Sequence, residues 1–359
     1  MKKNFLMYLL MTAFTVAFFA ACGGDDDKPK PGPGPTPGGG GKTPTETTWK
    51  DGVGTYDGNT LVIDGKAAAT SQKSAAIAIG SGDDAKITLT NVLPDTASVE
   101  FDGVKMTKSE SNYTFESETT VGATTISIKG TLSGIPATKA DETKEFSINV
   151  TRKINSPIVG TWKLNFSEKG GDVFVDVKTG DAAVDKQYAL LGAMLGGKMA
   201  EKVSAVTSIL TDNGAFDVNW VKQGEKDPTG MPPAIQSMVS IQYFVSENQL
   251  FVALDKSLLP LLGVFLGDNF NMDSLLALMV DKGGYYALPV SMKVEGDSAS
   301  FYMSKEMLGA VLVIATPILG NKLGDMDPVM AAMLKAMLEQ LPELIKKSEK
   351  FDVGLNFSK

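Results

Sequence analysis

The chain has 359 residues, a formal net charge of −8 and no histidine. The acidic balance argues against nucleic acid as a partner, because binding to the phosphate backbone depends on clustered lysine and arginine. Without histidine, and with Cys22 as the only cysteine, zinc sites of the His/Cys type, Ser-His-Asp or Cys-His catalysis and an internal disulfide are excluded. Arg152 is the only arginine, so bidentate arginine clamps on phosphate are nearly excluded as well.

Residues 1–21 have the composition of a targeting segment. Two lysines precede an apolar stretch at 5–19, and two alanines stand directly before Cys22. A permanent membrane span needs about 20 apolar residues, and this stretch is shorter. We therefore expect a signal peptide at 1–21.

The junction at Cys22 resembles the lipobox of bacterial lipoproteins, which implies cleavage before Cys22 and acylation of that residue, with palmitate as one such chain. The acidic run that follows two glycines, Asp25, Asp26 and Asp27, resembles the export signal of surface lipoproteins in the Bacteroidetes. This resemblance implies an outer-membrane lipoprotein that faces the cell exterior. The alternatives are an incidental cysteine and a solvated acidic spacer. Each buried methylene contributes about 0.8 kcal/mol, so several acyl chains anchor a protein firmly.

Residues 22–48 are expected to form the lipidated tether. Prolines recur between residues 29 and 37, and four glycines follow at 38–41. Such a composition buries nothing and stays extended. The tether therefore supplies reach between the membrane and the rest of the chain.

The remaining chain of about 310 residues is long enough for two domains. For residues 49–155 we expect an all-β sandwich of the immunoglobulin-like kind, because seven or eight short, threonine-rich strands alternate with turns. Asp102 and Gly103 predict the turn of a hairpin in this domain. Asp83 and Asp84, in a glycine-rich turn, are weak candidates for calcium ligands, and a plain polar turn is the alternative.

For residues 156–359 we expect an α+β fold built on an antiparallel barrel or sheet. Gly160 and Trp162 form a Gly-x-Trp motif that resembles the opening of lipocalin-like barrels, in which the tryptophan plugs the closed end. Those barrels place an arginine of the last strand beside this tryptophan, and the last strand expected here, 351–357, has none. About eight strands follow from the pattern, with hairpin turns at 246–248 and 295–297. Eight strands suffice for a small barrel that holds one ligand.

Helical segments interrupt these strands. Asp181 and Ser304 are predicted to begin two helices, and a third is predicted at 272–282, ending at Gly283.

The apolar character of these segments is unusual, and 257–267 and 307–321 carry no charged side chain. They are too short to span a bilayer, so they must be buried or must cover something apolar. Thirteen of the seventeen methionines lie between Met194 and Met337, and methionine is common on surfaces that accept varied apolar partners.

We therefore expect a non-enzymatic surface lipoprotein whose second domain binds a lipid or another apolar or amphipathic ligand. A solid helical core on the sheet is the alternative. The candidate lining residues of the pocket are Trp162, Trp220, Leu262, Phe265, Met279, Met307, Met333 and Met337.

Two other functions remain open. A glycan-binding or adhesive module would use exposed aromatic rings, and its candidates are Trp49, Trp162, Trp220, Tyr285 and Tyr286. A hydrolase would need paired carboxylates, and no spacing in the sequence singles out two acids. We expect no cofactor, and a protein or glycan partner is not identified by the sequence.

Overall fold

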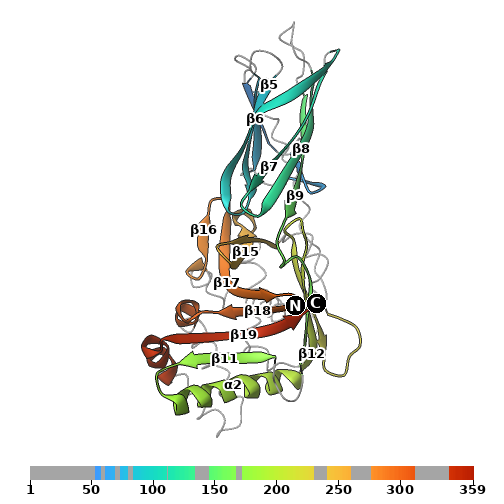
Figure 1. The fold of residues 1–359 in the computed structure, drawn as a ribbon. Helices are drawn as coiled ribbons and strands as arrows, with labels where there is room; N and C mark the ends of the chain where they lie inside the picture. Colours follow the sequence, from blue (N-terminus) through green and yellow to red (C-terminus); the bar gives the residue numbers. More distant parts are fainter. Residues whose placement is uncertain are drawn as a thin grey trace, which may run out of the picture.

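A computed structural model describes residues 53–57, 61–68, 73–79, 84–110, 112–133, 145–166, 172–229, 241–259, 276–311 and 339–359. The predicted signal peptide and tether lie outside these residues. The described chain is mostly β-structure, arranged as two curled sheets that follow one another along the sequence (Figure 1).

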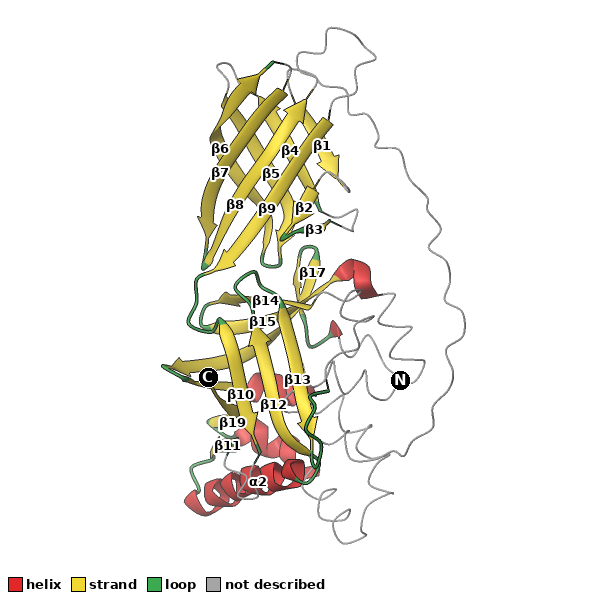
Figure 2. Ribbon diagram, turned by 90° about the vertical axis from the view of Figure 1, so that its right-hand side faces the viewer, coloured by secondary structure: helices red, strands yellow, loops and turns green. Residues whose placement is uncertain are grey.

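The first sheet has nine strands in the order β1-β4-β5-β6-β7-β8-β9-β2-β3 (Figure 2). All neighbours are antiparallel except β2 and β9, which are parallel. Alternate side chains point inward, as expected for strands with one buried face, and enclose an apolar core. The strands are β1 (Val53–Asp57), β2 (Leu61–Ile63), β3 (Lys66–Ala67), β4 (Ser74–Ile79), β5 (Asp84–Leu93), β6 (Thr96–Ser109), β7 (Asn112–Val121), β8 (Thr124–Ser133) and β9 (Glu145–Ile154).

The hairpin predicted at Asp102 and Gly103 is wrong, because β6 continues through both residues. Gly103 has a φ of 64°, and the pairing of β6 with β5 shifts beside it, between Ala85 and Ile87. This is a β-bulge, which bends a strand without reversing it. Beyond the bulge β6 pairs with β5 through Val104 and Lys105 and then with β7 from Met106 onward, so the bulge lies where the sheet curls around its core.

The second sheet has ten strands, eight of them in the order β13-β12-β10-β19-β18-β17-β15-β14, with β11 beside β19 and β16 beside β17. An isolated bridge between Ala215 and Gln242 brings its two end strands, β13 and β14, together, so the sheet is nearly closed. This agrees with the antiparallel barrel or sheet that the sequence predicts. The strands are β10 (Gly160–Asn165), β11 (Val173–Lys178), β12 (Val203–Leu210), β13 (Phe216–Lys222), β14 (Ile241–Ser246), β15 (Gln249–Asp255), β16 (Val280–Lys282), β17 (Tyr285–Glu295), β18 (Ser298–Met303) and β19 (Lys350–Ser358).

Helix α2 (Ala182–Ala200) runs along β11 at the end of the second sheet that is far from the first (Figure 1). Its predicted cap is confirmed, since the Asp181 side chain accepts hydrogen bonds from the backbone of Ala183 and Val184. A β-carbon at Gly192 would lie 2.9 Å from the backbone nitrogen of Val175, so the glycine allows α2 to approach β11 closely.

Other helical segments are short within the described residues. Residues 305–311, which follow Ser304 as predicted, and 339–347 are helical, and η3 (Lys256–Leu258) is a 3-10 turn. The helix predicted at 272–282 is wrong at its end, where Val280–Lys282 forms β16. Gly283, at a φ of 64°, lies in the turn between β16 and β17 rather than capping a helix. A short apolar run fits either structure, and pairing with β17 decides between them.

Two glycine-to-alanine substitutions should have opposite effects on the second sheet. A β-carbon at Gly354 of β19 would lie 2.5 Å from the Phe301 oxygen and 2.7 Å from Cζ of Phe174, whereas one at Gly309 in the helix would meet nothing within 4 Å. We expect Gly354→Ala to lower the free energy of unfolding by about 1–3 kcal/mol through overpacking. Gly309→Ala should raise it by up to about 1 kcal/mol through helix propensity. Denaturant unfolding measures both, and equal effects would contradict this packing.

Candidate functional site

One end of the second sheet is filled by aromatic side chains. Trp162 is fully buried and donates from Nε1 to the carbonyl oxygen of Ile158 at 2.7 Å, and Trp220 is buried in the same cluster. Lys359, which follows β19, places Nζ 4.7 Å from the centre of the Trp162 ring and donates to the carbonyl oxygen of Pro157 at 3.1 Å. The chain thus supplies a lysine beside this tryptophan, although its last strand contains no arginine.

Tyr243 of β14 completes this filled end. Its hydroxyl donates to the carbonyl oxygen of Thr211 at 2.7 Å. Burial, and then the nearby negative charge of Asp212, raise the pKa of Tyr243 well above its ordinary value. The hydroxyl therefore stays protonated and acts as a hydrogen-bond donor, not as a base or nucleophile.

The apolar interior continues toward the other end of the second sheet, where helices pack on it. Met307 packs on the cluster at this end, and Met279 packs on both this cluster and the one that holds the tryptophans. The cluster, which we call the helix-end cluster, consists of Val175, Val177, Tyr188, Leu278, Leu288, Met303, Leu308, Val311, Ile345, Phe351 and Val353.

The predicted pocket residues are therefore only partly brought together. Trp162 and Trp220 share one cluster, Met307 belongs to the other, and Met279 lies where the two meet. Four predicted members lie outside the described residues, namely Leu262, Phe265, Met333 and Met337. At the end that holds Trp162 and Trp220, side chains of the described residues fill the interior of the second sheet.

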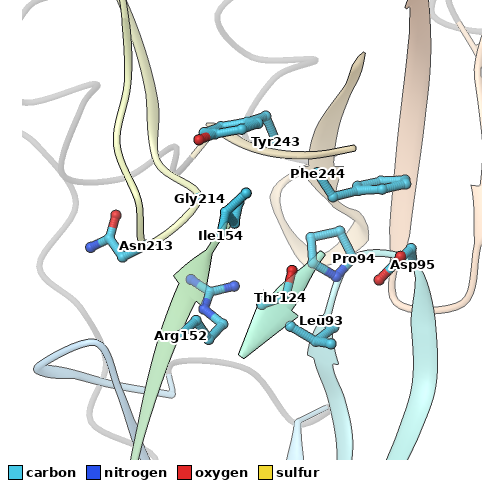
Figure 3. Close-up of a pocket in the computed structure, with 10 residues that line it drawn as sticks. All are labelled: Leu93, Pro94, Asp95, Thr124, Arg152, Ile154, Asn213, Gly214, Tyr243 and Phe244. Atoms are coloured by element: carbon cyan, nitrogen blue, oxygen red, sulfur yellow. The ribbon is translucent and has the colours of Figure 1, made fainter. Parts of the chain in front are cut away.

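A small pocket lies where the two sheets meet (Figure 3). It has room for about one water molecule. Arg152, from the end of β9, lies on one side of it, with Ile154 next along the strand and Tyr243 and Phe244 from the second sheet opposite (Figure 3). Its lining is completed by Leu93, Pro94, Asp95, Thr124, Asn213 and Gly214.

Arg152 is nine-tenths buried and its donors are used within the protein. Its Nε donates to Asp64 Oδ2 at 2.7 Å, and its Nη1 donates to Gln242 Oε1 at 2.7 Å and to the Val92 oxygen at 3.3 Å. The guanidinium therefore joins strands rather than binding an anion. The sequence marks this residue only as a lone arginine among lysines, and the partners are not visible in it.

A second buried polar group lies at the same junction. Lys73, just before β4, forms an ion pair with Asp255 at the end of β15, and both side chains are about nine-tenths buried. Asp255 Oδ1 also accepts from the backbone nitrogen and the hydroxyl of Ser257, at 3.0 and 2.6 Å. The Lys73 ammonium lies 5.2 Å from the centre of the Tyr285 ring.

The aromatic residues proposed for glycan stacking are mostly not available at the surface. Tyr285, predicted as part of an exposed pair, is fully buried, because its strand faces the first sheet. Tyr286 is half-buried beside Lys256, whose Nζ lies 4.7 Å from its ring centre. Trp49 lies outside the described residues, and Trp162 and Trp220 are buried.

The weak metal candidates are not assembled into a site. Asp84 forms an ion pair with Lys105 at 2.6 Å, and Asp83 lies outside the described residues. Within the described ranges, no three His, Cys, Asp or Glu side chains gather as a metal-binding group.

In the same ranges, no helix combines the length and apolar character that crossing a bilayer requires. Cys22, Asp25, Asp26 and Asp27 also lie outside the described ranges.

Comparison with protein-family models, with curated proteins and with solved structures gives no significant match to this chain.

Removing the Tyr243 hydroxyl should change the stability of the protein and its dependence on pH. Tyr243→Phe loses the hydrogen bond to Thr211, and we expect the free energy of unfolding at pH 7 to fall by about 1 kcal/mol.

Because the pKa of Tyr243 is raised in the folded state, the unfolded chain ionises this residue first. The contribution of Tyr243 to the free energy of unfolding is therefore complete below the ordinary tyrosine pKa of about 10, and it decreases as the pH rises above that value. Denaturant unfolding between pH 8 and about 11 should show a smaller alkaline loss in Tyr243→Phe than in the unsubstituted protein. Parallel curves would contradict the assignment.

Proposed function

We propose that the protein is a non-enzymatic outer-membrane lipoprotein that faces the cell exterior and binds an apolar or amphipathic ligand in its second sheet. Acylated Cys22 attaches it to the membrane, and residues 22–48 give it reach. One observation carries the ligand part of this proposal. The apolar interior of a nearly closed sheet extends from the Trp162 end through Met279 to the helix-end cluster.

The lipocalin-like description of residues 156–359, with inserted apolar helices, is part of the proposal. It is supported by Trp162 near the start of the first strand of the sheet and by the cation of Lys359 over its ring. A lysine there provides the same charge over the aromatic face as an arginine would, although without the planar stacking. The first sheet, which we propose to be immunoglobulin-like, serves as a spacer.

The ligand-binding hypothesis is favoured over the two alternatives. A glycan platform needs exposed rings, and Trp162, Trp220 and Tyr285 are buried. A hydrolase needs an accessible acid, base or nucleophile, whereas the buried carboxylates Asp64, Asp255 and Asp352 are held by basic partners. Met279, by contrast, is pliable and partly buried where the two apolar clusters meet.

A matched pair of methionine substitutions tests the ligand site. Met279 and Met292 are both partly buried, but only Met279 also packs on the helix-end cluster. Met279→Gln keeps a similar size and adds a polar group, so we expect it to weaken binding of a fluorescent fatty acid about tenfold, or about 1.4 kcal/mol.

Met292→Gln is the control and should leave fatty-acid binding within about twofold of the unsubstituted protein. Thermal unfolding of both variants checks that the fold is kept. The ligand proposal fails if the purified protein neither takes up the fatty acid nor contains co-purified lipid by mass spectrometry.

The attachment through Cys22 has its own test. Cys22→Ser removes the acylated thiol, and we expect the protein to move from the membrane fraction to the soluble fraction and to lose incorporation of labelled palmitate. Asp25→Ala combined with Asp26→Ala and Asp27→Ala keeps the thiol, so palmitate incorporation should be unchanged while surface exposure to added protease is lost. Retention of Cys22→Ser in the membrane would refute lipid anchoring.

A further inference from the structure

We infer that the two sheets form one rigid, cooperatively unfolding body, because two buried polar contacts and one close steric approach fix the angle between them. These contacts come from three separate places on the first sheet and reach three separate strands or turns of the second. The inference does not depend on a ligand in the second sheet.

The first contact lies at the end of β9. Arg152 is bound to Asp64 of its own sheet by Nε and Nη2, at 2.7 and 2.6 Å, and this pair holds the guanidinium in place. Its Nη1 then donates to Gln242 of β14. Two residues on, the backbone nitrogen of Ile154 donates to the Asp212 oxygen at 2.6 Å, and the Ile154 side chain is buried in the core of the second sheet. The end of β9 therefore lies in the core of the second sheet.

The second contact is the ion pair between Lys73 and Asp255. An ion pair buried this deeply is weak evidence for stability, because removing both charges from water costs several kcal/mol. What it does specify is geometry, since a small rotation of one sheet would leave two opposite charges buried without a partner. Ser257 holds the carboxylate in position, and the Tyr285 ring lies beside the ammonium.

The third contact is between Asn91 and the turn that joins β16 to β17. A β-carbon at Gly283 would lie 3.3 Å from Oδ1 of Asn91, and one at Gly284 would lie 3.2 Å from its Cβ and Cγ. The glycine pair thus allows this turn to approach Asn91, which itself has a left-handed φ of 54°. A β-carbon at either position would lie closer to Asn91 than an ordinary van der Waals contact, so the Asn91 side chain or the turn would have to shift by a few tenths of an ångström.

The three contacts begin at separate elements of the first sheet, namely Arg152 of β9, Lys73 before β4 and Asn91 of β5, so a rotation of one sheet against the other must disturb more than one of them. Phe244, from the β14–β15 hairpin, stacks on Phe251 with ring centres 4.7 Å apart, and Phe244 and Pro94 both line the small pocket between the sheets (Figure 3). Sliding or bending would break at least one buried polar contact. The sheets should therefore move and unfold together.

Calorimetry on the full chain tests this inference. The unsubstituted protein should show one unfolding transition for both sheets. Asp255→Asn keeps the hydrogen-bond acceptor for Ser257 but leaves the Lys73 charge buried and alone, so the transition should split in two or its midpoint should fall by about 5–10 °C. Adding Lys73→Met to Asp255→Asn removes that charge and should recover at least half of the loss.

Gln242→Leu tests the Arg152 contact independently and should cause the same splitting even if Asp255→Asn does not fold. Lys293→Met is the control, because it removes an exposed ion pair with Glu295 on the second sheet and should leave the single transition unchanged. Two transitions in the unsubstituted protein would overturn the inference. So would Asp255→Asn and Gln242→Leu variants that unfold like Lys293→Met.

Discussion

The buried guanidinium of Arg152 is the contact on which the arrangement of this protein depends. It must be satisfied, because an unpaired buried charge costs several kcal/mol. Asp64 and the Val92 oxygen satisfy part of it from within the first sheet, and Gln242 contributes a further acceptor from the second. The only arginine of the chain thus lies where the two sheets meet. The planar fork of arginine suits this position, since it donates in several fixed directions at once.

The second sheet combines a filled end with an end that is covered by helices. Aromatic rings, Trp162 and Trp220 among them, fill one end, and Lys359 lies over the Trp162 ring. The helix-end cluster combines aliphatic side chains and methionine with the rings of Tyr188 and Phe351, and methionine adapts easily to the shape of what it contacts. The continuous apolar interior that joins the two clusters is the physical basis for proposing a ligand there, and the contacts between the sheets keep the second sheet in a fixed position relative to the first.

The sequence predicts local features well. The hairpin turns at 246–248 and 295–297, the strand at 351–357 and the Asp181 cap all depend on residues close together in the chain, and the structure confirms them. The turn at Asp102 and Gly103 fails because the same dipeptide suits a bulge, and the pairing of β6 with two different strands decides between them.

The contacts between the two sheets could not be predicted from the sequence, for a related reason. Lys73 and Asp255 are 182 residues apart, and Arg152 and Gln242 are 90 apart. Each looks like an ordinary surface residue until the sheets are placed together. Tyr285 is misjudged in the same way, because its neighbouring glycines suggest an exposed turn, whereas the turn is pressed against Asn91.

The distance between one point on each sheet tests the fixed junction most directly. Because Cys22 is the only thiol, Cys22→Ser gives a background in which Thr114→Cys on β7 and Lys163→Cys on β10, both exposed, can carry a pair of spin labels. Pulsed electron resonance should give one narrow distance distribution, no broader than the rotamers of the labels require. A broad or two-peaked distribution would contradict the account, because it would show that the sheets move independently despite the buried contacts between them.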